Sequence, residues 1–136
     1  MTQIRINRTE HLGNEKGRMT DRKTVVLVSH PSITHDTLIG MLASFSCLEV
    51  VSSAGALSTF DLLARVSPQT VVIDANLPHE ETLALLRYIK RDWPHIVCIV
   101  LATTSKQHSE LRTAGADILL SNNCTSRQLQ AAVCDS

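Results

Sequence analysis

Short, mainly apolar runs recur along the chain from Thr24 onward. They occupy residues 25–28, 48–51, 70–73, 96–101 and 118–120. A run of four to six apolar residues without alternation is typical of a parallel strand that is buried on both faces. The pattern therefore predicts five buried strands.

Amphipathic stretches separate these runs. Apolar residues at steps of three and four predict a helix over residues 33–45, with Pro31 in its first turn. Further helices are expected at 58–66 with Ser58 as the cap, at 80–91, at 106–114 closed by Gly115, and from Thr125 or Ser126 to Val133.

Five strands that alternate with five helices predict an α/β fold. Right-handed crossovers then give a doubly wound, five-stranded parallel sheet in the flavodoxin-like order 2-1-3-4-5. The ligand crevice of such a sheet lies beyond the carboxyl ends of its first and third strands. The functional residues are therefore expected at 29–31 and 74–78.

Residues 1–22 have no hydrophobic period and contain Gly13 and Gly17. We expect them to form a flexible N-terminal arm that precedes one domain at 23–136. The natural start could be Met1 or Met19, because Met19-Thr20-Asp21 also looks like a start.

Charge and cysteine content narrow the function classes. Lys+Arg and Asp+Glu number 13 each, which does not favour binding of nucleic acid by this domain. The longest apolar run, residues 96–102, is too short for a membrane span, and no secretion signal is seen, so a cytoplasmic location is expected. The four cysteines are widely spaced and are expected to be reduced thiols, with a disulfide or a metal site as the alternative.

Asp74 is the only carboxylate directly after a central apolar strand. The segment V-V-I-D-A-N-L-P at 71–78 resembles the third-strand signature of response-regulator receiver domains, and S-H-P at 29–31 resembles the opening of receivers that precede LuxR-type DNA-binding domains. Residues 48–51, 54–55 and 114–117 match the same family, so the resemblance covers about 24–133. It implies a receiver-like domain at 23–136 with Asp74 as the phosphoacceptor.

The supporting positions of that family are changed in this chain. In receivers, an acidic pair holds a divalent metal, and a lysine and a hydroxyl contact the phosphoryl group. The acidic pair falls here on Val28-Ser29 or Ser29-His30, and the lysine on Ser121 or Asn122. The expected crevice residues around Asp74 are Ser29, His30, Asn76, Ala102, Thr103 and Ser121. We therefore expect no resident cofactor, with Mg²⁺ used only if the domain can be phosphorylated.

The resulting hypothesis is an atypical two-component receiver, or pseudo-receiver, that works by binding a protein partner. The resemblance implies a histidine kinase or an output domain as that partner, as in transcription regulation, or a dimer through the last two helices at about 106–133. An enzyme is not expected, because no base–nucleophile pair, metal motif or glycine-rich loop is present. The alternative is a small flavodoxin-like protein that binds a ligand or a metal in the same crevice, where His30 and His79 could be metal ligands.

Overall fold

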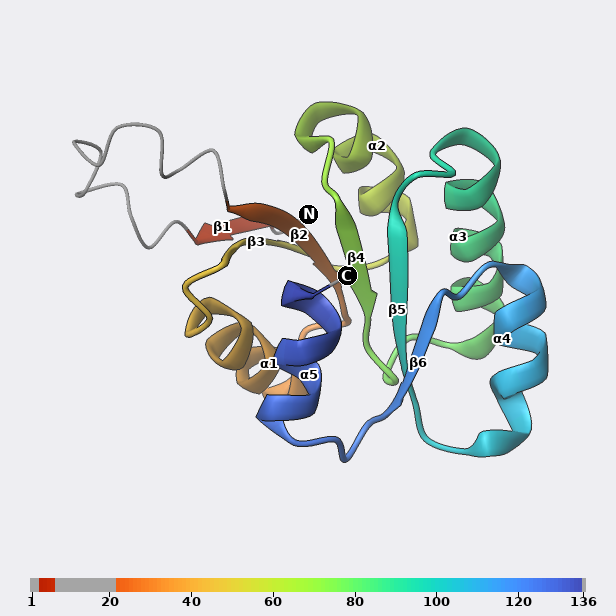
Figure 1. The fold of residues 1–136 in the computed structure, drawn as a ribbon. Helices are drawn as coiled ribbons and strands as arrows, with labels where there is room; N and C mark the ends of the chain where they lie inside the picture. The colour runs from red at the N-terminus through yellow and green to blue at the C-terminus, as the bar shows by residue number, and fades with distance from the viewer. Residues whose placement is uncertain (1–2, 7–21, 136) are drawn as a thin grey trace.

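The computed structural model describes residues 3–6 and 22–135 (Figure 1). Within these residues the strands are β1 (Gln3–Ile6), β2 (Lys23–Val28), β3 (Leu48–Ser53), β4 (Thr70–Ile73), β5 (Val97–Ala102) and β6 (Ile118–Ser121). The helices are α1 (Ile33–Ala43), α2 (Ala56–Val66), α3 (His79–Asp92), α4 (His108–Ala114) and α5 (Ser126–Cys134), and a 3₁₀ turn, η2 (Ser105–Gln107), precedes α4.

The strands form one sheet in the order β1-β3-β2-β4-β5-β6. Strands β2 to β6 are all parallel, and their order is the predicted 2-1-3-4-5 arrangement, which is confirmed. Val28 of β2 lies opposite Ile73 of β4, so the two central strands end at the same level. The residues that follow them are therefore brought side by side.

Helices cover both faces of the sheet. Helices α1 and α5 lie on one face, and α2, α3 and α4 lie on the other (Figure 1). All four residues of β4, and Val25 to Val28 of β2, are buried. Because alternate residues of a strand point to opposite faces, each central strand needs apolar side chains at nearly every position. This requirement explains why residues 25–28 and 70–73 are almost entirely apolar.

Strand β1 lies in the segment that was expected to be a flexible arm. Residues 3–6 pair antiparallel with β3, with Gln3 opposite Ser53 and Ile6 opposite Val50. The sequence pattern did not predict this strand, because four residues are too short for their alternation to be distinguished from the surrounding polar sequence. The flexible arm and the domain boundary at residue 23 stay predictions. The rest of the expected arm, residues 7–21, lies outside the described residues.

Two helix starts differ from the sequence prediction. Ser32 is the N-cap of α1 and accepts a hydrogen bond from the His35 amide, so Pro31 precedes the cap instead of occupying the first turn. Helix α2 begins two residues before Ser58, with Gly55 as its N-cap. The Ser58 hydroxyl donates to the Gly55 carbonyl from within the first turn, which explains why it resembled a capping residue.

Thr125 is the cap of α5, and Gln128 completes its capping box.

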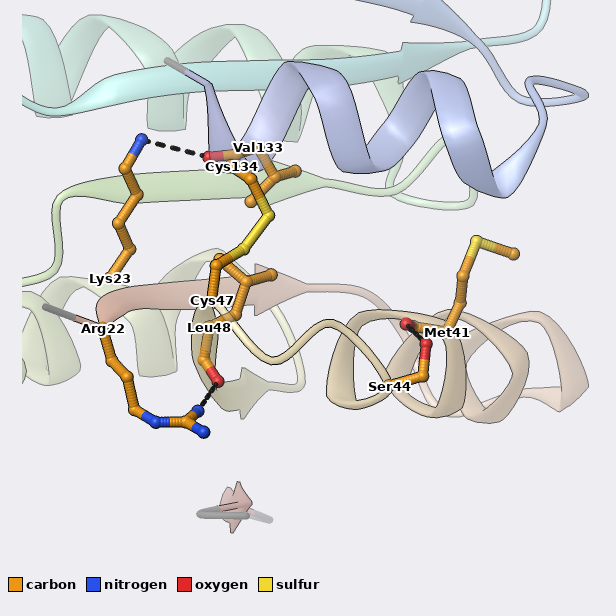
Figure 2. Close-up of a disulfide and its surroundings, with 8 residues drawn as sticks. All are labelled: Arg22, Lys23, Met41, Ser44, Cys47, Leu48, Val133 and Cys134. Atoms are coloured by element: carbon orange, nitrogen blue, oxygen red, sulfur yellow. Dashed lines mark hydrogen bonds between the residues drawn. A yellow bond between two sulfur atoms is a disulfide. The ribbon is translucent and has the colours of Figure 1, made fainter. Parts of the chain in front are cut away.

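Cys47 and Cys134 form a disulfide, so the expectation of four reduced thiols is wrong for this pair (Figure 2). Cys98 and Cys124 are free.

Gly115 ends α4, as predicted, in a conformation with a φ of 129°. A Cβ there would collide with Lys90 Cγ, and the ammonium of Lys90 is held by Asp117 at 2.6 Å. We predict that Gly115→Ala lowers the free energy of unfolding by about 2 kcal/mol, because it combines backbone strain with overpacking.

Gly40 provides the matched control, because a Cβ on this exposed helical residue meets nothing within 4 Å. Gly40→Ala should raise the free energy of unfolding by about 0.5–1 kcal/mol. Urea titrations of both variants and of the natural protein measure the two changes. Equal effects of the two substitutions would show that the Gly115 conformation does not matter for stability.

Candidate functional site

Ser29 and Asp74 are the first residues after the two central strands. Each continues the backbone hydrogen bonding of the sheet: the Ser29 amide donates to the Ser53 carbonyl at 3.0 Å, and the Asp74 amide donates to the Val28 carbonyl at 2.9 Å. Both backbones are thus fixed by the sheet. The two side chains meet in the crevice at the sheet's carboxyl edge.

The carboxylate of Asp74 is buried and hydrogen-bonded at both oxygens. Asp74 is only 2% exposed to solvent. The Ser29 hydroxyl donates to Oδ2 at 2.8 Å, and the Ala75 amide donates to Oδ1 at 2.6 Å. Within the described part of the chain, Asp74 has no Lys, Arg or His within ion-pair distance. Neutral donors therefore replace a counter-ion at this carboxylate.

Asn76 closes the loop that follows β2. Its Oδ1 accepts from the His30 amide at 3.2 Å, and its Nδ2 donates to the His30 carbonyl at 3.1 Å. Ser29 Oγ also lies 3.3 Å from Asn76 Oδ1, but one hydroxyl proton can serve only one strong bond, and Asp74 is closer. The Asn76 amide therefore holds the loop backbone, and the Ser29 proton stays with Asp74.

Two cavities meet at Asp74. The larger, of about 260 Å³, extends under α3 and α4; its lining includes Asp74, Pro78, His79, Thr82, Ala102, Thr103, Gln107 and Leu111. The smaller, of about 210 Å³, extends toward α1; its lining includes Thr34, Leu38, Asp74, Asn76, Thr103 and Asn122. Asp74 is the charged side chain common to both.

The crevice gathers most of the residues that were expected from the sequence. Ser29, His30 and Asn76 share the network just described, and Thr103 lines both cavities. Ser121 is exposed, and its hydroxyl accepts from the Asn123 amide within its own loop. Asn122 is instead the residue of that loop that lines the cavity, and it brings no positive charge.

Glu81 is a crevice-edge residue that sequence reasoning missed. Its Oε2 accepts from the Ala56 amide at 2.9 Å, and its Oε1 lies 3.8 Å from His30 Nε2. The carboxylate thus joins the N-terminus of α2 to that of α3. The sequence did show that Glu81 lies in the first turn of a helix, where an acid is favourable. It did not show that the carboxylate bonds Ala56, which is 25 residues away.

The two histidines near the crevice face different partners. His30 Nδ1 contacts the Ala54 carbonyl at 3.1 Å, whereas His79 Nε2 contacts Glu110 at 2.9 Å, between α3 and α4. Among the described residues no three His, Cys, Asp or Glu side chains are grouped to hold a metal ion. The described residues therefore give no support to the metal-binding alternative.

No protein-family model matches the sequence, and no curated protein sequence does. Solved structures do match. The chain is similar to the signal receiver domain of an HD domain-containing protein from Pseudomonas fluorescens Pf-5, with a TM-score of 0.73, 22% identity, and coverage of 82% of this chain and 91% of that one. It is also similar to a LuxR-family two-component response regulator from Aurantimonas sp., with a TM-score of 0.74, 19% identity, and 82% coverage of both chains.

A third similar structure is the Mn²⁺-bound form of response regulator Rcp1. Its TM-score is 0.63 at 18% identity, and the match covers 83% of this chain and 90% of that one. These identities are low, so the matches establish the fold alone. The chain has the fold of response-regulator receiver domains.

We predict that Ser29→Ala lowers the free energy of unfolding by about 1–3 kcal/mol, because it leaves Asp74 Oδ2 buried without a donor. Asp74→Asn should also destabilise the protein. The double variant should lose less than the sum of the two by about 0.5–3 kcal/mol, since each single change removes the same hydrogen bond.

Ser44→Ala is the control, because the Ser44 hydroxyl bonds only the exposed end of α1. Its effect in urea unfolding should stay within about 0.5 kcal/mol. Additive losses for Ser29 and Asp74 would show that their hydrogen bond is not coupled in solution.

Proposed function

We propose that this chain is a receiver-type signalling domain that acts by binding a protein partner, with Asp74 at the phosphoacceptor position serving as a fixed structural anchor. The observation that carries the proposal is the hydrogen bond from the Ser29 hydroxyl to Asp74 Oδ2 at 2.8 Å. Ser29 stands where the resemblance implies an acidic residue. A metal-binding acid is thus replaced by a donor that occupies the acceptor oxygen.

The donors around Asp74 do not fit Mg²⁺. This ion prefers several oxygen ligands in octahedral geometry and is usually bound through one or two carboxylates together with phosphate. Here Asp74 is the one carboxylate at the point where both cavities meet, and both of its oxygens already accept hydrogen bonds. His30 presents its ring to Ala54 and Glu81 instead. We therefore derive no step that uses a metal.

A phosphoryl group on Asp74 would also lack a counter-charge. Two anions can approach only if cations or several donors offset their repulsion, which in phosphoryl transfer is most of the catalytic work. Asn122 and Thr103 offer neutral groups at the positions that the family fills with a lysine and a hydroxyl. These residues support a crevice that stays in one state.

The outer edge strand of the sheet is the candidate surface for a partner. Strand β6 is the edge strand, and its Ile118, Leu119 and Leu120 are half-buried. Helices α4 and α5 flank it on the two faces (Figure 1). Apolar side chains beside unpaired strand backbone favour protein contacts. We assign this edge as the surface for a kinase, an output domain or a second copy of the chain.

The proposal also covers compartment and activity. In the described residues no helix is long and apolar enough to span a membrane. We propose a cytoplasmic signalling module without enzymatic activity, which contacts proteins and leaves any DNA binding to another domain. Ligand binding in the crevice is the rival function. The two cavities at Asp74 are lined by few charged groups, and among the described residues no three metal-ligating side chains are grouped, so the geometry favours the signalling role.

The direct test is incubation with a small acyl-phosphate donor and Mg²⁺, read by intact-protein mass spectrometry. We predict no stoichiometric gain of one phosphate, because Asp74 lacks metal ligands and a counter-charge. Sedimentation velocity of the same samples should show no change in association state.

Asp74→Asn serves as the control for modification elsewhere. A phosphate adduct that forms on the natural protein and is lost in Asp74→Asn would overturn the proposal.

A further inference from the structure

The disulfide between Cys47 and Cys134 joins two parts of the chain that are 87 residues apart in the sequence. Cys134 is the last residue of α5, and Cys47 directly precedes β3 (Figure 2). Their Cα atoms are 6.2 Å apart, within the range that a disulfide spans. The bond thus fastens the C-terminal end of α5 at the edge of the sheet opposite the Asp74 crevice.

Helix α5 packs on the sheet through a narrow apolar face, with Ala132 and Cys134 partly buried at its border. Of its nine residues, Leu129 and Val133 are the two that are buried. Lys23 Nζ donates to the Val133 carbonyl at 3.3 Å, beside the disulfide (Figure 2). The remaining residues are exposed or partly exposed, and the capping box of Thr125 lies within the helix itself. The disulfide therefore adds a covalent link to a helix that has a small buried face.

The bonded pair is also the reactive pair. Cys47 and Cys134 are both half-buried, so a reductant can approach them. Cys98, by contrast, is fully buried, and burial raises the pKa of its thiol to about 12. Burial also raises the pKa of Cys124. Since the thiolate is the reacting species, the raised pKa values disfavour exchange at the free cysteines, most strongly at the buried Cys98.

We propose that Cys47–Cys134 is a reversible thiol–disulfide switch that controls the docking of α5. A thiolate of a dithiol reductant attacks one sulfur of the bond, which gives a mixed disulfide and one free cysteine thiolate. The second thiol of the reductant then displaces the other cysteine. Two electrons and two protons pass to the protein, which ends with two thiols, and the reductant ends as a disulfide.

Reduction loosens α5 because it opens the covalent ring that closes on the sheet. In the oxidised protein Leu129 and Val133 pack in the same apolar cluster as Val72, Ile99 and Leu101 of the sheet. Once the ring is open, the two buried side chains and the hydrogen bond of Lys23 must hold the helix. A redox-sensing role is also compatible with the cytoplasmic location proposed above, where persistent disulfides are rare, although the inference does not depend on that location. This inference stands on the disulfide alone and does not require the proposed partner binding.

The test uses the whole chain in air-oxidised and dithiothreitol-treated form. Thiol alkylation in denaturant, read by mass spectrometry, should count two free cysteines before reduction and four after it, and removal of dithiothreitol should restore two. Hydrogen–deuterium exchange of the 126–134 amides should become at least about tenfold faster on reduction, with β2 and β4 nearly unchanged.

Cys134→Ser should reproduce the reduced exchange pattern without a reductant. Cys124→Ser should leave both the switch and the exchange rates as in the natural protein. If Cys134→Ser does not fold, the reduced natural protein gives the same reading. Four free cysteines in the air-oxidised protein, failure of the bond to re-form, or α5 exchange that is unchanged by reduction would overturn the inference.

Discussion

The hydrogen bond from Ser29 Oγ to Asp74 Oδ2 joins the carboxyl ends of the two central strands of the sheet. Because both strands are buried on both faces, their ends cannot shift without disturbing the core. The carboxylate must therefore find its donors within the loops that follow the strands. Ser29 and the Ala75 amide supply them, and Asn76 fixes the loop that presents Ser29. Neutral groups thus supply the donors that surround this carboxylate.

This arrangement separates the fold from the chemistry usually expected of it. A buried carboxylate is tolerated only if it is well hydrogen-bonded, and this one is satisfied at both oxygens. Each oxygen thus has a neutral donor, and no cation lies within ion-pair distance of it among the described residues. A domain without a phosphate switch at Asp74 needs another site of regulation. The switch that we propose at Cys47–Cys134 would act on α5, whose Leu129 and Val133 pack in the same apolar cluster as Ile118 and Leu120 of β6.

The fold could be predicted because buried parallel strands leave a strong signal. The runs 25–28 and 70–73 lie within β2 and β4 or coincide with them, and Gly115 marked the end of α4. Asp74 could be found because strand order places its strand at the centre. The remainder depends on contacts between distant residues. Glu81 meets Ala56, and Cys47 meets Cys134, only after helices have packed on the sheet, and no local pattern encodes either pairing.

The central claim is that the crevice around Asp74 has a single state that phosphate chemistry does not change. The most direct measurement is an amide NMR titration with beryllofluoride and Mg²⁺, following Ala75, Asn76 and Thr103 at the crevice and Leu119 in β6. The account predicts no saturable shift of these four resonances at millimolar concentrations of the ions. Saturable shifts at Ala75 and Asn76 that extend to Leu119 would contradict it, because they would show that the crevice binds a phosphoryl mimic and transmits the change to the sheet's edge.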